Sequence, residues 1–528
     1  MTVVRPNRSA ATDESSRTAL SRRRLTQLAA GGAIAGLAGC TAFTDSGEDE
    51  VVRVASRNTI SSVDPLNNGT ILQRIGLTEC LVRVDFEAEL APALAESWSV
   101  ADDDVTWTFS LRNDATFHDG THFDAEAAIP SLERAFTSSS LADVPFETVR
   151  ATDEYELEIV TEEPFAPLPA YAAMREAAIL GPDSYEDGDV VTPHATGPFQ
   201  FDELVPEEEI ALSRFDDYHG TVPAVEGVVY DSIPDNQTRA LAVENGDAEM
   251  GRVLPSSAID RFDDRDDVRV DVYEIPRMRC AQFNTRFAPF DDERVRQAAS
   301  FAIDRESIAN DLLEGIADTA VGPYPSVVEW EADDLEPYEH DLEQARSLLA
   351  DAGWEATEDG VRRRDGEPLE IRVVTYPNRP ALPDIATVLQ DQLGEVGFDV
   401  DVEVIEVSAI HERAAEAADV VIWSANVYGW PADPDRLHYV YHSTEGGLHH
   451  GYDNERVDEL LEEGRRAVGD PERRKELYDE VQRITMEEVP ITYLTYYEMI
   501  VAQTTDLEGY DQHPTEYGFH LENVDLDR

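Results

Sequence analysis

The amino-acid sequence predicts an α/β fold built as more than one lobe. Segments typical of strands and helices alternate along the chain, and no linker rich in proline or serine separates them into independent domains. Residues 385–396 predict a helix that ends at a glycine, and Val400, Val402 and Val404 then alternate with acidic residues as in a strand. The 489 residues from Cys40 onward are too many to fold around one hydrophobic core of ordinary size, so two or three lobes are expected.

The first elements after the N-terminal region fit this class. Residues 51–55 predict a strand, and residues 106–111 predict a half-buried one, because large apolar side chains alternate there with threonine and serine. Asp124 can cap a helix that runs to Phe136, and Pro130 is expected to kink it.

Three helices are predicted further along the chain. They occupy residues 238–245, a segment that opens at Asp291 or Asp292 and runs through Phe301, and residues 340–352. A glycine follows the first and the last of them, and glycine commonly ends helices because it adopts positive φ without strain.

The N-terminal segment carries the marks of export. Arg22 and Arg23 resemble a twin-arginine signal, and residues 25–38 form a mildly apolar run. That run is too short to cross a bilayer of about 30 Å. Export is therefore favoured over a membrane-spanning helix.

A cysteine ends this segment. Residues 37–40, Leu-Ala-Gly-Cys, resemble a lipobox, so residues 1–39 are predicted to be a removable signal and Cys40 to carry a lipid. Residues 40–50 would then be an acidic tether. The alternative is a chance arginine cluster followed by a buried cysteine.

The net charge of the chain is extreme. It has 110 acidic and 42 basic residues, a net charge of −68, and Lys475 is its only lysine. Loss of residues 1–39, which hold six arginines and two acids, leaves −72. Dispersed acids on a chain that is 42% hydrophobic indicate a folded protein of an extreme halophile, and the sign of the charge excludes nucleic acid as a partner. A binder of polycations or calcium is the weaker alternative, because no calcium-loop spacing is present.

Two cysteines remain in the predicted mature chain, Cys80 and Cys280. Both lie in apolar surroundings, which favours two buried unpaired thiols over a disulfide or a catalytic pair.

Twelve short motifs occur along the chain, at residues 90–98, 107–112, 117–120, 123–128, 195–199, 233–240, 246–247, 283–285, 295–298, 302–305, 345–353 and 433–434. In this order they resemble family 5 of the extracellular solute-binding proteins, the receptors of peptide and nickel ABC importers. Each motif alone is weak, but twelve in order are a strong indication.

The resemblance implies a two-lobed clamshell of the periplasmic-binding-protein type (type II). Lobe I is expected over residues 51–282 with an inserted subdomain near 95–195, lobe II over 283–492, and a return to lobe I over 493–528. The chain should cross the hinge near residues 283–284 and 491–497.

The implied function is solute capture outside the cell and delivery to an ABC permease and ATPase, by a monomer without catalysis or a resident cofactor. A ligand held between two lobes stabilises the closed form of the protein, and the permease recognises this closed form.

The ligand is expected near residues 423–452. In peptide-binding relatives an aspartate three residues before an Asp-Pro pair neutralises the peptide amine, but here Trp430 precedes Asp433 at that spacing. The amine partner is therefore missing or supplied elsewhere. Its absence tilts the expectation toward a nickel-type small solute, or a nickel chelate as cargo, while peptides stay a candidate as the broad expectation for the family. The candidate ligand-binding residues are Arg175, Tyr428, Trp430, Asp433 and His442, and the candidate metal ligands are His438, His442, His449 and His450.

Each candidate also has a simpler interpretation. The histidines can be solvated loop residues, Trp430 can be hinge packing, and Arg175 can be a surface ion pair.

Other functions are also open. A secreted metal-dependent hydrolase would use His118, His122 and an acid, although in the family this segment is a structural turn. A surface chaperone or adhesion role is a further alternative.

Overall fold

The computed structural model describes residues 50–325, 328–379, 381–410, 418–426, 433–448 and 451–528. The predictions for Cys40, Tyr428, Trp430, His449 and His450 fall outside these residues. None of the described helices is long and apolar enough to cross a membrane.

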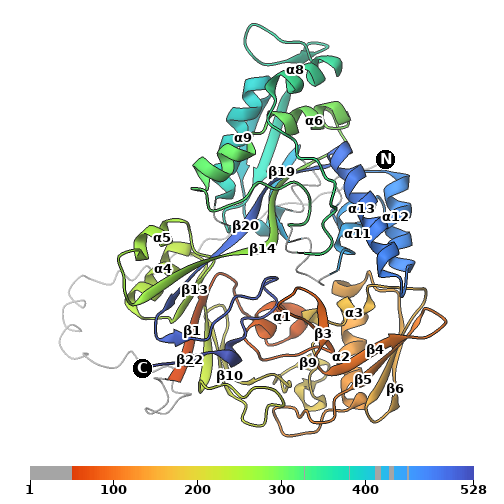
Figure 1. Cartoon of the computed structure of the whole chain (residues 1–528), viewed down its shortest axis with the longest axis vertical. Helices are drawn as coiled ribbons and strands as arrows, with labels where there is room; N and C mark the ends of the chain where they lie inside the picture. Colours follow the sequence, from red (N-terminus) through yellow and green to blue (C-terminus); the bar gives the residue numbers. More distant parts are fainter. Residues whose placement is uncertain (1–49, 326–327, 380, 411–417, 427–432, 449–450) are drawn as a thin grey trace, which may run out of the picture. The chain divides into compact units, whose positions relative to one another are not determined.

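A ten-stranded mixed sheet runs through the molecule (Figure 1). In spatial order its strands are β10 (Phe199–Val205), β11 (Glu209–Arg214), β12 (Gly227–Ser232), β1 (Val51–Ser56), β13 (Met250–Arg252), β20 (Ile491–Thr504), β14 (Val268–Phe283), β19 (Val420–Asn426), β17 (Glu370–Thr375) and β18 (Asp399–Val404). Strand β1 is parallel to β12 and β13, and β17 is parallel to β18 and β19. The remaining pairs are antiparallel.

Strands β14 and β20 connect the two ends of this sheet. They pair along nearly their whole length, while β13 borders one end of β20 and β19 borders the other end of β14. Their register shifts between Ile275 and Met278. Pro276 lies in this gap and has no N–H for the ladder, which accounts for the irregularity.

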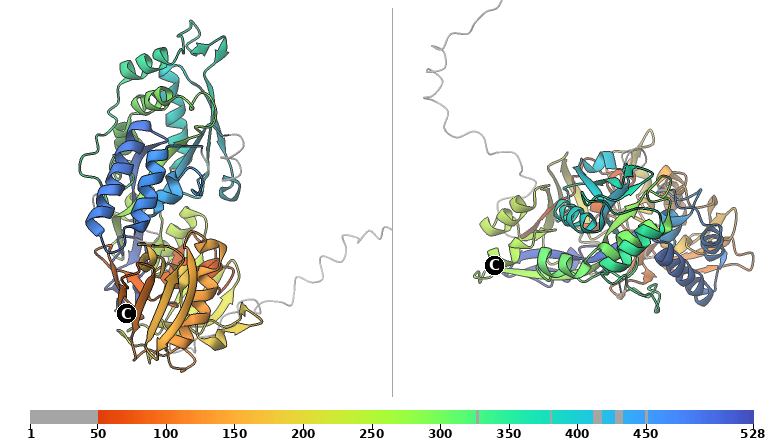
Figure 2. Two further views of the ribbon diagram at one scale, coloured as in Figure 1. Left: turned by 90° about the vertical axis from the view of Figure 1, so that its right-hand side faces the viewer. Right: turned by 90° about the horizontal axis from the view of Figure 1, so that it is seen from above.

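A separate antiparallel sheet, drawn mainly in orange in Figure 2, has the order β4-β5-β7-β6. Its strands are β4 (Ala95–Val100), β5 (Thr106–Leu111), β6 (Phe146–Asp153) and β7 (Glu156–Thr161). Trp107, Phe109 and Leu111 are buried, which confirms the predicted alternation. Helix α2 (Ala125–Phe136) packs on this sheet and continues beyond Pro130 as one helix.

Helices α6 (Glu293–Ala302), α8 (Leu342–Asp351) and α9 (Leu382–Val396) share a hydrophobic core with β17, β18 and β19. All three correspond to predicted helices. The carboxylates of Asp292 and Asp341 accept backbone N–H groups at the first turns of α6 and α8, and α9 ends at Gly397 with φ of 106°. The predicted helix 238–245 is α4 (Asn236–Asn245), which ends at Gly246.

The elements around the site are short helices and an antiparallel helix pair. They are α1 (Pro65–Arg74), α3 (Leu168–Tyr171), the 3₁₀ turn η3 (Arg175–Ala177), α11 (Arg436–Tyr441), α12 (Glu455–Arg466) and α13 (Pro471–Glu488). Smaller elements include α5 (Ser257–Phe262), α7 (Arg305–Ser307), β2 (Val82–Val84), β3 (Leu90–Pro92), β8 (Tyr185–Glu186), β9 (Asp189–Val190), β15 (Arg363–Arg364), β16 (Glu367–Pro368), β21 (Leu507–Glu508) and β22 (Asp525–Leu526).

Candidate functional site

A cavity of about 460 Å³ lies where the central strands of the long sheet meet the short helices. Strands β14, β19 and β20 form one wall, while α1, η3 and α11 form the others. Its apolar lining residues include Met278, Trp423, Leu437, Tyr439, Val440 and Tyr493. This volume is typical of sites for small molecules.

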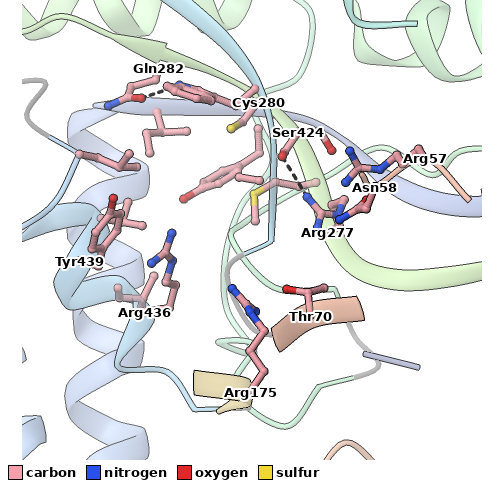
Figure 3. Close-up of a pocket in the computed structure, with 18 of the residues that line it drawn as sticks. Arg57, Asn58, Thr70, Arg175, Arg277, Cys280, Gln282, Ser424, Arg436 and Tyr439 are labelled. Atoms are coloured by element: carbon pink, nitrogen blue, oxygen red, sulfur yellow. Dashed lines mark hydrogen bonds between the residues drawn. The ribbon is translucent and has the colours of Figure 1, made fainter. Parts of the chain in front are cut away.

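Five arginines line the cavity: Arg57, Arg74, Arg175, Arg277 and Arg436. Arg57 directly follows β1, the others come from α1, η3, β14 and α11, and Figure 3 shows four of them directing their guanidinium groups into the same space. No aspartate or glutamate is among the described residues that line it. The cavity of this strongly acidic protein is therefore cationic.

Local structure explains two of these positions. Arg277 follows Pro276 at the register shift of β14, and its Nη1 donates to the Ser424 carbonyl at 3.1 Å. Arg175 lies against α1 at Gly69, where a Cβ would be 3.0 Å from the Arg175 carbonyl oxygen. Glycine therefore permits the close approach of α1 and η3.

One buried carboxylate, Glu516, lies behind the cavity. It is 3.6 Å from guanidinium nitrogens of both Arg74 and Arg277. Burial alone would raise the pKa of Glu516, but Arg74, Arg277 and Arg379 together lower it to about 2. Glu516 is therefore ionised and shared among several arginines.

The cavity arginines also lie close to other positively charged side chains. Burial, together with neighbouring Arg379 and Arg277, lowers the pKa of Arg57 to about 9. Burial and Arg379 likewise lower the pKa of Arg277 to about 10. These groups remain protonated at neutral pH, so the excess of positive charge persists.

Of the predicted site residues that the structure describes, Arg175 lines this cavity. Asp433 is buried and receives two hydrogen bonds from Arg474, at 2.8 and 3.0 Å. The carboxylate of Asp433 is thus engaged in a structural ion pair outside the cavity lining.

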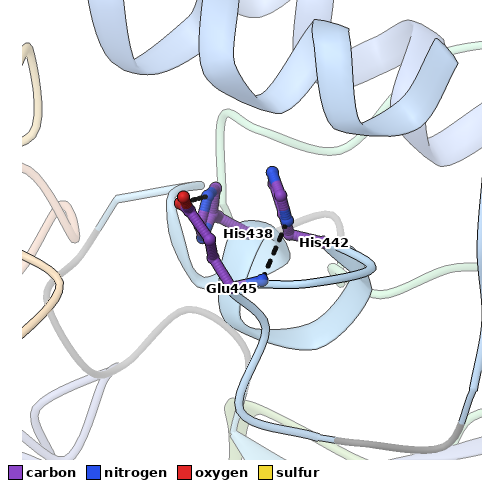
Figure 4. Close-up of side chains that lie close together, drawn as sticks. All are labelled: His438, His442 and Glu445. Carbon is purple, nitrogen blue, oxygen red and sulfur yellow. Dashed lines mark hydrogen bonds and ion pairs between the residues drawn. The ribbon is translucent and has the colours of Figure 1, made fainter. Parts of the chain in front are cut away.

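His438 and His442 are also outside the cavity lining. With Glu445 they form a separate cluster whose candidate ligand atoms all lie within 4.8 Å of one another (Figure 4). The Nε2 atom of His438 is 3.4 Å from Glu445 Oε2. Burial and Arg465 lower the pKa of His438 to about 3, so its imidazole is neutral.

The hydrogen bonds of His442 are less suited to a metal. Its Nδ1 accepts the backbone N–H groups of Thr444 and Glu445, at 3.3 and 3.1 Å. The ring proton of the neutral form is then on Nε2, which lies 3.6 Å from Glu462. A metal ion would have to displace that proton or those two contacts.

His118 and His122 have separate structural partners. The Nε2 atom of His118 is 3.0 Å from the Gly197 carbonyl, and its Nδ1 accepts the Ala195 N–H. His122 contacts the Tyr155 hydroxyl at 2.8 Å. Both nitrogens of His118 are thereby occupied, as in a structural turn.

Cys80 and Cys280 are buried free thiols, and Cys280 contributes to the cavity wall. Burial raises the pKa of Cys280 to about 12, so this thiol is not an activated nucleophile.

Sequence reasoning missed Arg57, Arg74, Arg277 and Arg436, which lie far apart in the chain. One usable signal was present for Arg277: it stands directly after a proline inside a long strand.

Comparison with known proteins agrees with this architecture. The model of the bacterial extracellular solute-binding proteins, family 5 middle, matches residues 89–447. The nickel-binding periplasmic protein of Escherichia coli is 26% identical over 495 residues, covering 87% of this chain and 92% of that protein. The probable di/tripeptide-binding protein 5 of Pseudomonas aeruginosa is 27% identical, covering 92% and 95%.

Solved structures show the same fold. NikA from Brucella suis in complex with Fe(III)-EDTA gives a TM-score of 0.82 at 23% identity, covering 90% of this chain and all of that one. AppA from Bacillus subtilis in complex with a nonapeptide gives 0.77 at 22% identity, covering 91% and 99%. The predicted α/β fold of the periplasmic-binding-protein type is thus confirmed, and the chain belongs to family 5 of the bacterial extracellular solute-binding proteins.

Proposed function

We propose that this protein is the substrate-binding component of an ABC importer, which captures a small solute outside the cell and delivers it to a membrane permease. The observation that carries the proposal is the 460 Å³ cavity, because strands β14, β19 and β20, the segment after β1 and the short helices all contribute to its wall. A ligand that contacts all of them favours the arrangement that encloses it.

The relatives bind nickel or peptides, and the cavity favours a solute of the nickel type. A free peptide amine needs a carboxylate or carbonyl partner, and no acid is among the described lining residues. A compact chelate whose carboxylates meet arginines fits better. Peptides remain the second candidate because peptide-binding relatives match over similar lengths.

Uptake by cells tests this function. Deleting the gene should abolish import of the solute that co-purifies with the protein in native mass spectrometry, and the full chain should restore it. A co-purified solute whose import is unaffected would contradict the proposal. Hydrolysis of esters or peptides that a chelator abolishes would instead support the hydrolase alternative.

The protein is proposed to act at the outer face of the cell membrane, held by a lipid on Cys40 after twin-arginine export. Cys40→Ser should release it from the membrane fraction or leave it unprocessed, and Arg22/Arg23→Lys should block export. Cell fractionation with an antibody checks both variants. Unchanged localisation of both would show that residues 1–39 are not a lipoprotein signal.

A further inference from the structure

We propose that the solute is multiply anionic, with at least two acidic groups such as carboxylates or phosphates. This inference rests on the proposed function and narrows its ligand. It follows from the sign and the arrangement of the charges around the cavity.

The first step is charge balance on the side of Glu516. Three lining arginines, Arg57, Arg74 and Arg277, share this one carboxylate with Arg379 behind them. Three positive charges against one negative charge leave two without a counter-charge before Arg379 is included. These three arginines are half-buried, where charges that lack a counter-charge are costly, and an anionic ligand reduces that cost.

The second step is the position of the remaining arginines. Arg175 and Arg436 enter from η3 and α11, on other sides of the cavity from Arg57 and Arg277 (Figure 3). Arg175 also pairs with the buried Glu176 at 3.2 Å, so its charge is shared between that carboxylate and a ligand. Acidic groups at separate ends of one solute would therefore each meet guanidinium groups. Arginine binds carboxylate and phosphate oxygens through two parallel hydrogen bonds, so both chemistries fit.

The third step is the apolar part of the wall. Trp423 and Tyr439 line the cavity, and Trp423 Nε1 donates to Gln282 at 2.7 Å, which holds the indole in place. An apolar surface in the same cavity as the arginines suits a short carbon skeleton that carries the acidic groups. An ammonium group has no acidic partner among the described lining residues.

Calorimetry in multi-molar KCl tests the proposal with matched probes. The carboxylate arm compares propane-1,2,3-tricarboxylate with its trimethyl ester, and the phosphate arm compares fructose 1,6-bisphosphate with fructose. Dialanine represents a peptide. We expect at least one of the anions to bind and its neutral counterpart to bind at least about 100-fold more weakly, and the arm that binds identifies the source of the charge.

Variants test the residues. Arg57→Gln and Arg436→Gln should each weaken the anion about 10- to 100-fold, the range of a charge-assisted hydrogen bond. Arg150→Gln is the matched control, because this half-exposed arginine pairs with Glu158 in the separate four-stranded sheet. Circular dichroism verifies folding, and Arg57→Lys, which keeps the charge, should recover part of the affinity.

Three outcomes overturn the inference: neither anion binds, the neutral counterparts bind equally well, or dialanine binds more tightly than both anions. The proposed function is judged separately. A neutral solute or a peptide that co-purifies and is imported would preserve the receptor and refute only its anionic ligand.

Discussion

Arginine has two roles in this chain, and burial separates them. Many arginines form exposed ion pairs with neighbouring acids, such as Arg294 with Asp292. Those around the cavity are enclosed with few acids nearby. The guanidinium group is more weakly hydrated than an ammonium, which makes such a cluster less costly than one of lysines.

The residues of the site could be predicted only in part. Arg175 was predicted because the family resemblance implied a ligand-binding arginine in the inserted subdomain near residues 95–195. Arg57 and Arg436 belong to segments more than 370 residues apart, and only the folded sheet brings them to one cavity. His442 was predicted from its neighbours in the sequence, but α11 directs Tyr439 and Val440, rather than His442, to the cavity wall.

His442→Gln should leave the affinity for the cavity solute unchanged, because His442 is not part of the cavity lining. His438→Gln should behave in the same way, and calorimetry with the co-purified solute checks both. A large loss of affinity in either variant, with folding intact, would mean that the histidine cluster takes part in solute binding.

Glu498→Gln should stabilise the protein above neutral pH. Burial, only partly offset by Arg279 at 4.0 Å, raises the pKa of Glu498 to about 7. The folded state therefore holds the proton more tightly than the unfolded state, and this contribution is lost as pH rises from about 4.3 through about 7.

The glutamine amide should remove the cost of ionising Glu498 in the folded protein. It should raise the free energy of unfolding by roughly 1–3 kcal/mol at pH 8 and by much less at pH 5. Thermal unfolding at both pH values in constant KCl measures it. Equal destabilisation at both would show that Glu498 is needed as an acceptor.

At the scale of elements, the strongest predictions were those with a local cause. Aspartate caps and glycine stops located α4, α6, α8 and α9 because these signals act within one helical turn. The sequence predicted that the chain crosses the hinge near residue 283, but it did not predict the register shift of β14 at Pro276. That shift depends on pairing with β20, more than 200 residues away.

Asp435 joins three elements that pack beside the site. It accepts two hydrogen bonds from Arg465 of α12, at 2.7 and 2.9 Å, and one from the Tyr171 hydroxyl of α3 at 2.8 Å. Asp435→Asn should lower the free energy of unfolding by about 3–5 kcal/mol, because Arg465 keeps a buried charge without its partner. Denaturant unfolding at constant salt measures the loss.

The control is Asp334→Asn, which removes an exposed pair with Arg483 and should cost under about 1 kcal/mol.

The pair of Asp435 with Arg465 also predicts that stability depends on pH. Burial would raise the pKa of Asp435, but Arg465 lowers it to about 2. The stabilisation by ionised Asp435 is fully present above about pH 3.9 and is lost as the pH falls through about 2. The free energies of unfolding of the wild-type protein and the Asp435→Asn variant should therefore differ less at pH 2 than at pH 7. An equal difference at both pH values would contradict this account.

At the scale of the whole molecule, the sequence was informative about class and charge. Motifs in family order identified the fold because they recur along most of the chain. The cavity could not be predicted, since its charge is opposite to that of the composition and arises from residues of many segments.

The net charge predicts that salt stabilises the fold. Dilution from about 1 M to about 0.1 M salt lengthens the screening distance from about 3 Å to about 10 Å, so repulsion among the acids grows. The melting temperature should fall steadily over this range. A melting temperature that does not respond to salt would indicate that the acids are balanced locally by ion pairs.

The cationic cavity within an anionic body also has a kinetic consequence. A negatively charged solute in dilute buffer is repelled over long distances and meets the arginines only at the cavity mouth. Concentrated salt shortens the range of that repulsion, so the association rate of the solute should rise as salt is added. This is the reverse of ordinary electrostatic steering. For such a receptor, concentrated salt would act as the condition that opens the approach to its binding site.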